Sequence, residues 1–396
     1  MGKIKEFLGL NGSMYAMIVL VMFLGLGEKM AERYLPLYLI ALGGTAFLAG
    51  MLNSLNNFLN AIYSLPGGYA AQRFGYKKSL VFFTLLAMFG YAVVIAFPSW
   101  QAVFVGAIFF ISWNAVTLPA VMSLVSKTVK SDKRTMGVSI HSFVRKIPMA
   151  LGPIVGGWLI ASYGTVLGIR LAFIMALALS TLALWFMYAK MEDETPPKQD
   201  ESLFSFFKGI KGPLRNLLLS DTLIRFAEQI PYAFVVLWVV QICGFSPVKF
   251  GFLSALEMAV SMLIYIPVAY LADKSEKKPF VLATFAIFTA FPLALYFSRT
   301  MMALVLVFVL RGLKEFGEPT RKALIMDLAP EGKKAGTFGA YYLIRDVIVS
   351  LGAAVGAYLW TVSPAINLIT AFACGVIGTL VFAFWGKEVK REAIQG

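Results

Sequence analysis

The sequence predicts an all-α membrane protein of 12 transmembrane helices, built as two parallel six-helix repeats. Three observations support this prediction. Hydrophobic residues make up 59% of the 396 residues and charged residues only 14%, against about 45–50% and about 25% in typical soluble domains. Twelve apolar segments are long enough to cross a bilayer, and the second half of the chain repeats residues of the first half. A soluble enzyme, a disordered chain and a disulfide-stabilised fold are therefore excluded.

The twelve apolar segments define the helices. Crossing about 30 Å of hydrocarbon takes about 20 helical residues, and a backbone in lipid must satisfy its own hydrogen bonds, which favours helices over the shorter strands of a barrel. We place spans 1 to 12 at residues 14–42, 46–72, 79–98, 100–126, 137–163, 167–189, 216–243, 247–272, 279–298, 300–326, 336–361 and 365–386. The polar connection 190–215 divides the chain into an N-terminal bundle (1–189), a cytoplasmic linker (190–215) and a C-terminal bundle (216–396).

The formal charge of +14 is mostly an orientation signal. Twenty-four Lys and Arg residues lie in the termini, the linker and one alternating set of loops, and three lie in the opposite set. Because membrane proteins keep basic residues in their cytoplasmic loops, we expect a multi-pass protein of the cell (inner) membrane with both termini in the cytoplasm. Nucleic acid is not an expected partner.

The two halves align as copies of each other. An offset of 200 aligns Glu28 with Glu228 and Arg145 with Arg345, and an offset of 201 aligns Lys77 with Lys278. With six spans in each, both repeats begin on the same side of the membrane. Repeats of this kind are parallel, and their substrates bind near the midplane between them.

The cytoplasmic loops after spans 2 and 8 resemble the signature G-x-L-a-D-r-x-G-r-k of the major facilitator superfamily. The residues that carry the resemblance are Gly68, Arg73 and Gly75 in the first loop and Asp273 in the second. Membership of that superfamily implies a fold of 12 spans and a cytoplasmic gate at these four residues. The alternative is that the loops serve only as positively charged anchors on the cytoplasmic side.

Span 5 contains a second motif of the superfamily. Its residues Gly152, Pro153, Gly156 and Gly157 are similar to the G-P-x-x-G-G motif of prokaryotic 12-span proton-coupled antiporters. This resemblance implies export of a solute. Helix packing explains the same pattern, because small residues let two helices approach closely.

Charged residues inside spans mark candidate sites, because they are costly in a membrane unless they are paired or hydrated. They fall on spans 1, 5, 7, 8, 10 and 11. The proton-coupling candidates are Glu28, Glu228 and Glu257. Burial disfavours a charged carboxylate and a nearby cation favours it, and alternating access changes both effects, so such a group can exchange a proton. Alternatively, ion pairs with Arg145, Arg345 or Lys29 hold the helices together.

The substrate cavity is expected to be lined by further polar residues of these spans: Lys29, Glu32, Asn114, Arg145, Lys146, Arg311, Lys314, Arg345 and Asp346. Within span 10, the i,i+4 spacing predicts the ion pairs Arg311–Glu315 and Lys314–Glu318. Basic and acidic residues nearly balance within the spans. A zwitterion, an amphipathic anion and a weakly charged drug therefore remain open as substrate classes.

The sequence predicts a secondary active transporter that moves a small solute by alternating access. Proton-coupled export (antiport) is the first hypothesis, and uptake by symport, uncoupled carriage and lipid flipping are the alternatives. The sequence contains no metal-binding, nucleophile-elbow or phosphate-loop motif, so we expect no enzyme activity, no cofactor and no metal. The expected partners are a small-molecule substrate, protons and membrane lipids, and the expected state is a monomer.

Overall fold

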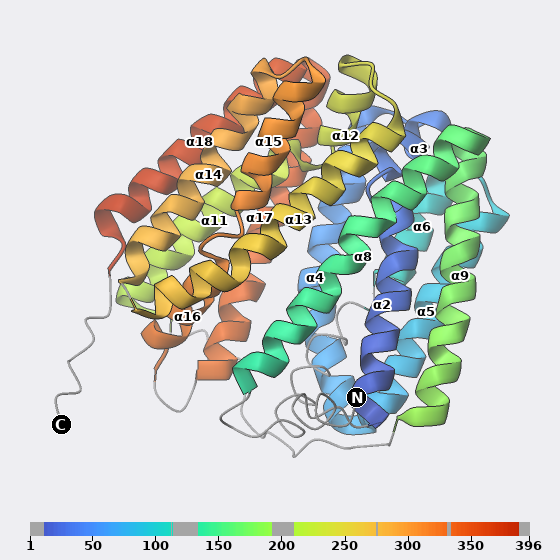
Figure 1. The fold of residues 1–396 in the computed structure, drawn as a ribbon, viewed down its shortest axis with the longest axis horizontal. Coiled ribbons are helices and arrows are strands. Elements are labelled where there is room, and N and C mark those ends of the chain that lie inside the picture. The colour runs from blue at the N-terminus through green and yellow to red at the C-terminus, as the bar shows by residue number, and fades with distance from the viewer. Residues whose placement is uncertain are drawn as a thin grey trace. The chain divides into compact units, whose positions relative to one another are not determined.

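The computed structural model describes residues 12–111, 113, 134–191, 210–274, 276–330 and 334–387, which are mostly helical (Figure 1). The helices of the first half are α2 (Gly12–Glu32), α3 (Leu35–Ala41), α4 (Ala46–Phe74), α5 (Tyr76–Ala96), α6 (Trp100–Phe110), α8 (Arg134–Tyr163) and α9 (Thr165–Lys190). Those of the second half are α11 (Gly212–Tyr232), α12 (Val235–Leu237), a π-helical turn (Trp238–Ile242), α13 (Pro247–Lys274), α14 (Lys277–Phe297), α15 (Met301–Leu313), α16 (Glu318–Leu328), α17 (Lys334–Val362) and α18 (Pro364–Trp385).

Eleven of the 12 predicted spans coincide with a helix or with consecutive helices within these ranges, and the described part of span 4 contains α6. Seven helical stretches of the described residues are long and apolar enough to cross a membrane. They are Lys77–Ala96, Thr165–Lys190, Gly212–Ile242, Pro247–Ile264, Lys277–Phe297, Gly339–Val362 and Pro364–Trp385. Helices α6 and α15 are shorter apolar helices. The predicted all-α membrane fold is therefore confirmed.

Spans 1, 7 and 10 were predicted as continuous helices, and that prediction is wrong. Span 1 breaks between α2 and α3, and span 7 breaks at the repeat-equivalent position between α11 and α12. Span 10 breaks between α15 and α16, where the backbone N–H of Gly317 donates to Thr284 Oγ1 at 2.6 Å and α16 begins with a proline in its first turn. Because the helix ends at Leu313, the i,i+4 spacing across this break does not place Lys314 and Glu318 on one helical face.

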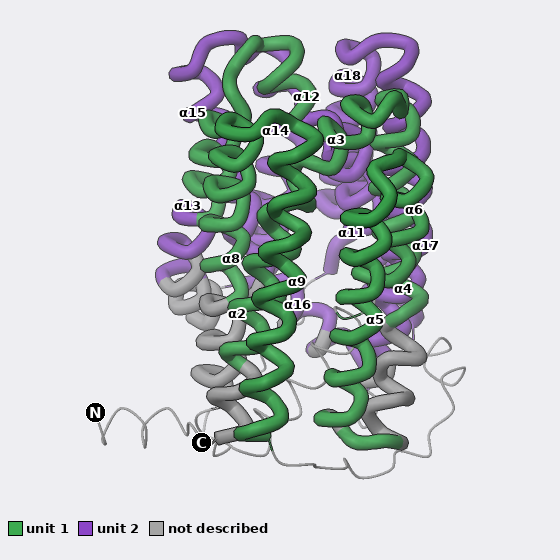
Figure 2. Tube along the Cα trace, turned by 90° about the vertical axis from the view of Figure 1, so that its right-hand side faces the viewer, with its two compact units in different colours: residues 1–199, 236–258 green, residues 200–235, 259–396 purple. Residues whose placement is uncertain are grey.

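The chain forms two compact units (Figure 2). Unit 1 comprises residues 1–199 and 236–258, and unit 2 comprises residues 200–235 and 259–396. Residues 236–258 therefore belong to unit 1, although they follow the linker in the sequence. The predicted bundle boundaries at 189 and 216 stay a prediction.

Equivalent helices pack in the same way within each unit. In unit 1, α2 packs against α8 and α9, and in unit 2 α11 packs against α17 and α18. A Cβ atom at Gly156 would lie 2.0 Å from the carbonyl oxygen of Met30, and one at Gly356 would lie 2.1 Å from that of Ile230. These four residues form two repeat-equivalent pairs, so the same glycine position brings two backbones together in both units.

Tyr34 joins three elements of unit 1. Its fully buried hydroxyl shares one hydrogen between the carbonyl oxygens of Pro153 on α8, at 2.6 Å, and Pro247 on α13, at 2.9 Å. Gly157 approaches the same Pro247 carbonyl closely enough to exclude a Cβ atom. The span 5 motif thus makes helix contacts in this structure, as the packing interpretation requires.

The repeat-equivalent lysines Lys77 and Lys278 close the ends of two helices. Lys77 Nζ donates to the carbonyl oxygen of Met191 at 2.6 Å, after the end of α9. Lys278 Nζ donates to the carbonyl oxygen of Ala383 at 3.0 Å, in the last turn of α18. Such carbonyls lack partners within the helix, and a cation is favourable there. These two lysines, in the first turns of α5 and α14, therefore stabilise neighbouring helix ends.

The hydrophobic core of unit 2 lies among α11, α14, α16, α17 and α18. Its fully buried members include Leu217, Phe285, Ile325, Tyr341 and Phe382. This core fixes α11, α16 and α17 beside one another, and those three helices supply most of the charged residues described next.

Candidate functional site

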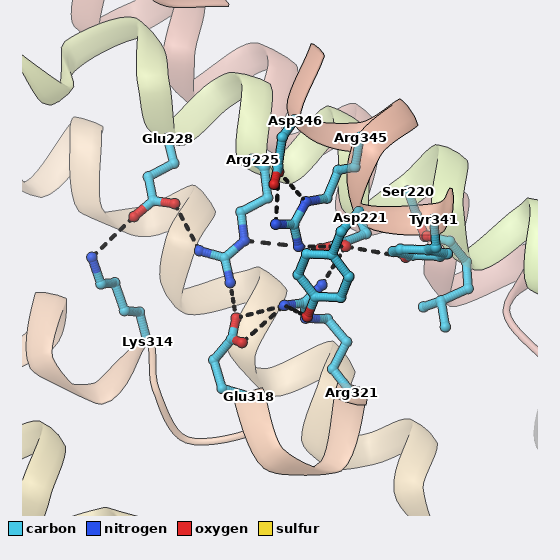
Figure 3. A network of polar contacts seen from close by, with 12 residues as sticks. Ser220, Asp221, Arg225, Glu228, Lys314, Glu318, Arg321, Tyr341, Arg345 and Asp346 are labelled. Atoms are coloured by element: carbon cyan, nitrogen blue, oxygen red, sulfur yellow. Dashed lines mark hydrogen bonds and ion pairs between the residues drawn. The ribbon is translucent and has the colours of Figure 1, made fainter. Parts of the chain in front are cut away.

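Eight charged side chains of unit 2 form a continuous chain of alternating sign, which we call the charge chain (Figure 3). In order, its members are Lys314, Glu228, Arg225, Glu318, Arg321, Asp221, Arg345 and Asp346. They come from α11, from the turn after α15, from α16 and from α17. Each interior member contacts an opposite charge on both sides, which offsets the cost of burying it.

The Lys314 end of the charge chain centres on Glu228. Lys314 Nζ lies 2.9 Å from Glu228 Oε1, and Arg225 Nη1 lies 2.9 Å from Glu228 Oε2. Arg225 also pairs with Glu318, which accepts a hydrogen bond from Arg321 Nη2 at 2.8 Å. Glu228 and Glu318 therefore tie α11 to both sides of the break in span 10.

Asp221 is the most deeply buried member of the charge chain, with a side-chain exposure of 0%. It pairs with Arg321, and it accepts from Arg345 Nη1 at 3.3 Å and from the hydroxyl of Tyr341 at 3.1 Å. Arg345 then pairs with Asp346 at 2.7 Å. Three helices, α11, α16 and α17, thus meet at one carboxylate.

A pocket with about 300 Å³ of empty space, part of it open to solvent, lies at the Lys314 end of the charge chain. It is lined by Glu228, Tyr232, Phe288, Phe291, Arg311 and Lys314, all in unit 2. The guanidinium carbon of Arg311 lies 4.9 Å from the centre of the Phe291 ring and 5.7 Å from that of Tyr232. Lys314 Nζ lies 5.8 Å from the centre of the Phe288 ring. These distances fall within the range of cation–π contacts.

The predicted site residues of unit 1 form a smaller group on α2. Lys29 Nζ lies 3.2 Å from Glu28 Oε1, and Lys29 also pairs with Glu32. Arg145 on α8 is exposed, whereas its repeat equivalent Arg345 is only 8% exposed. The repeat therefore preserves the identity of these residues but not their surroundings.

The other predicted site residues lie apart from the charge chain or outside the described residues. Glu257 on α13 is fully buried and Lys146 on α8 is half-buried, both in unit 1. Asn114 lies outside the described residues, as do the side chains of Arg73 and Asp273. Gly68 lies in α4, and Gly75, with a φ of 89°, forms the turn into α5. The predicted gate therefore stays a prediction.

The candidates predicted from the sequence do not include Asp221, Arg225, Arg321 and Tyr341, which belong to this site. The i,i+4 spacing of Asp221 and Arg225, which lie 3.9 Å apart, was the available signal. A sequence separation of 100 between Asp221 and Arg321 gives no such signal.

A family model described as Major Facilitator Superfamily matches residues 17–227 and 217–395. The chain belongs to this superfamily. This membrane transporter is 20% identical over 377 residues to an uncharacterized MFS-type transporter of Methanocaldococcus jannaschii, and the match covers 91% of each chain. It is 22% identical over 376 residues to the multidrug resistance protein MdtH of Photorhabdus laumondii, over 89% of this chain and 88% of the relative. The family resemblance predicted from the loop motifs is confirmed.

The fold of this superfamily member is similar to that of solved transporters. A crystal structure of a peptide transporter POT superimposes with a TM-score of 0.76 and 15% sequence identity, over 94% of each chain. A crystal structure of the nucleoside transporter NupG gives a TM-score of 0.77 and 13% identity, over 94% of this chain and 99% of that one. At these identities the similarity shows the fold alone, so substrate and coupling must be argued from this chain's own residues.

Proposed function

We propose that this protein is a secondary active transporter that moves a small solute by alternating access and couples the movement to protons through Glu228. The observation that carries the proposal is the position of Glu228, which lines the cavity and is also a member of the charge chain. A proton on Glu228 removes its charge, so it weakens the ion pairs with Lys314 and Arg225. Protonation of this one group changes both the charge of the cavity and the contacts between α11 and the turn after α15.

Glu228 is the first candidate because it contacts a separate element. One basic partner of its repeat equivalent Glu28 is Lys29, the next residue of the same helix. The partners of Glu228 include Lys314, which is 86 residues away and belongs to another element. Only a contact between separate elements can transmit a protonation event to a movement of one element against another.

The charge of the substrate decides the direction of coupling. A cationic solute and a proton compete for the Glu228 carboxylate, which gives antiport and hence export. An anionic solute at Lys314 is favoured by a proton on Glu228, which gives symport. The Gly152–Gly157 motif and the relatives named multidrug resistance proteins support export. The two basic side chains of the cavity, Arg311 and Lys314, support symport of an anion.

The test is proton movement in proteoliposomes that contain the purified full-length protein and an entrapped pH-sensitive dye. A library of small solutes is added outside, and solutes that change the internal pH are identified. We expect Glu228→Gln to abolish the solute-evoked proton movement and Glu276→Gln to retain it, because Glu276 is exposed at the start of α14.

Two outcomes would contradict the proposal. Proton movement that persists in Glu228→Gln would exclude this residue as the coupling group. Solute flux in the wild-type protein without any proton movement would exclude coupling and support an uncoupled carrier.

A further inference from the structure

The cavity at the Lys314 end of the charge chain brings together two chemical features. Its basic side chains, Arg311 and Lys314, lie beside the rings of Tyr232, Phe288 and Phe291. Arginine and lysine donate charge-assisted hydrogen bonds to carboxylates and similar oxyanions. Aromatic rings bind flat apolar groups by stacking or edge contacts. The lining therefore matches a solute that carries one anionic group on a flat apolar body.

An anion can displace Glu228 from Lys314 without leaving Glu228 unpaired. Glu228 Oε1 accepts from Lys314 and Oε2 accepts from Arg225, each at 2.9 Å. When an anion takes Lys314, the Arg225 contact keeps the buried carboxylate paired, and an uncompensated buried charge is the main cost of breaking such a pair. An anion that takes Lys314 therefore breaks the Lys314–Glu228 pair and leaves the Glu228–Arg225 pair in place.

The other end of the charge chain has the opposite preference. It ends in the carboxylate of Asp346, which pairs with Arg345 at 2.7 Å. An incoming cation would be favoured there, but Asp346 does not line the cavity. The cavity and the basic end of the charge chain coincide, and this coincidence favours an anion over a cation or a zwitterion.

We propose that this cavity binds an amphipathic organic anion, whose carboxylate or sulfonate contacts Arg311 and Lys314 and displaces Glu228 from Lys314. The flat apolar body of the solute lies among Tyr232, Phe288 and Phe291. The inference rests on the proposed function only in treating this cavity as the substrate site. It predicts that the anion and the negatively charged Glu228 carboxylate compete for Lys314.

The test is isothermal titration of the purified full-length protein in lipid nanodiscs with a matched panel of probes. The anions are 2-naphthoate, 2-naphthalenesulfonate and 4-phenylbutyrate. Their controls are the corresponding neutral amides, 2-naphthylmethylammonium as the cation, and acetate as an anion with no apolar body. We expect at least one aromatic anion to bind about 10-fold or more tightly than its amide, the cation or acetate, as the strength of a charged hydrogen bond implies.

Three variants locate the binding. Lys314→Met should weaken binding of the preferred anion about 10-fold to 100-fold, and Lys314→Arg should retain most of it. Glu228→Gln should strengthen binding, because it removes the carboxylate that competes for Lys314; a purely structural role of Glu228 does not predict a gain. The control Lys249→Met should leave binding unchanged, because Lys249 is exposed and stacks on Phe245 in unit 1.

The outcomes separate this inference from the proposed function. A panel in which no anion binds better than its amide, or a cation that binds as tightly as the anions, would overturn the inference. So would Glu228→Gln binding that is weaker than that of the wild type. Selective anion binding by a protein that moves no protons would support the inference and refute the proton coupling.

Discussion

Replacement of Asp221 by asparagine is the sharpest test of the charge chain as a structural unit. The Asp221 carboxylate is fully buried and pairs with Arg321 and Arg345, and it also accepts from the Tyr341 hydroxyl. Removing one partner of a buried ion pair costs about 3–5 kcal/mol, because the other charge stays buried without compensation. An asparagine keeps the shape and an acceptor for Tyr341 but loses the charge.

The size of the loss follows from the contacts that remain in Asp221→Asn. Arg321 keeps Glu318 at 2.8 Å, and Arg345 keeps Asp346 at 2.7 Å. Each arginine therefore retains one carboxylate, and the expected loss in the free energy of unfolding lies at the lower end of the range, at about 3 kcal/mol.

The assay for Asp221→Asn is reversible unfolding of the purified protein by sodium dodecyl sulfate in mixed micelles. The matched control is Asp327→Asn, which removes an acid that is 40% exposed and pairs with Lys277. Exposed pairs contribute about 0–1 kcal/mol, so the control should remain close to the wild type. A loss in Asp221→Asn no larger than in Asp327→Asn would refute the inference that Asp221 holds three helices together.

Three further predictions use the same unfolding assay. Gly356→Ala should destabilise the protein by about 1–3 kcal/mol, because its Cβ would lie 2.1 Å from a carbonyl oxygen of α11. The control Gly339→Ala should be neutral or stabilising by about 1 kcal/mol, because a Cβ at Gly339 would face open space. Equal effects of the two substitutions would contradict the close approach of α17 to α11 at Gly356. Lys278→Met should lower stability by about 0.3–1 kcal/mol through loss of a cation at the end of α18, and no loss would exclude that capping role. Tyr34→Phe should cost about 1–3 kcal/mol, because it leaves the buried Pro153 carbonyl and the partly buried Pro247 carbonyl without their hydroxyl donor. The exposed Tyr163→Phe should change stability by less than about 0.5 kcal/mol.

The number of spans was predictable from the sequence, but their breaks were not. A helix in lipid must present apolar side chains over a fixed length, so hydropathy alone locates it. Proline and glycine are frequent in transmembrane helices that remain continuous, so their presence in spans 1, 7 and 10 did not predict the ends of α2, α11 and α15. The break in span 10 depends on the contact of Gly317 with Thr284, 33 residues away.

The charge chain shows the limit of repeat symmetry as a predictor. Glu28 and Glu228 occupy equivalent positions in the repeat, and both are predicted from the sequence as coupling candidates. In the structure Glu228 pairs with Lys314 on another element, and Glu28 pairs with its neighbour Lys29. The repeat equivalent of Asp221 is Val21, so unit 1 has no acid at the position where three helices of unit 2 meet. Ion pairs between helices depend on packing, which diverges faster than the helices themselves.

A single variant, Glu228→Gln, decides the direction of coupling, because glutamine mimics the protonated carboxylate. In symport, the proton and the solute favour each other's binding, so Glu228→Gln must bind the solute more tightly than the wild type while failing to move protons. In antiport, they exclude each other, so the same variant must bind the solute more weakly. The positive charges of Arg311 and Lys314 require tighter binding of the solute and hence symport. The motif in span 5 implies weaker binding and hence antiport. Binding and proton movement, measured on this variant, therefore test whether the cavity or the resemblance to antiporters is the better guide to transport by this protein.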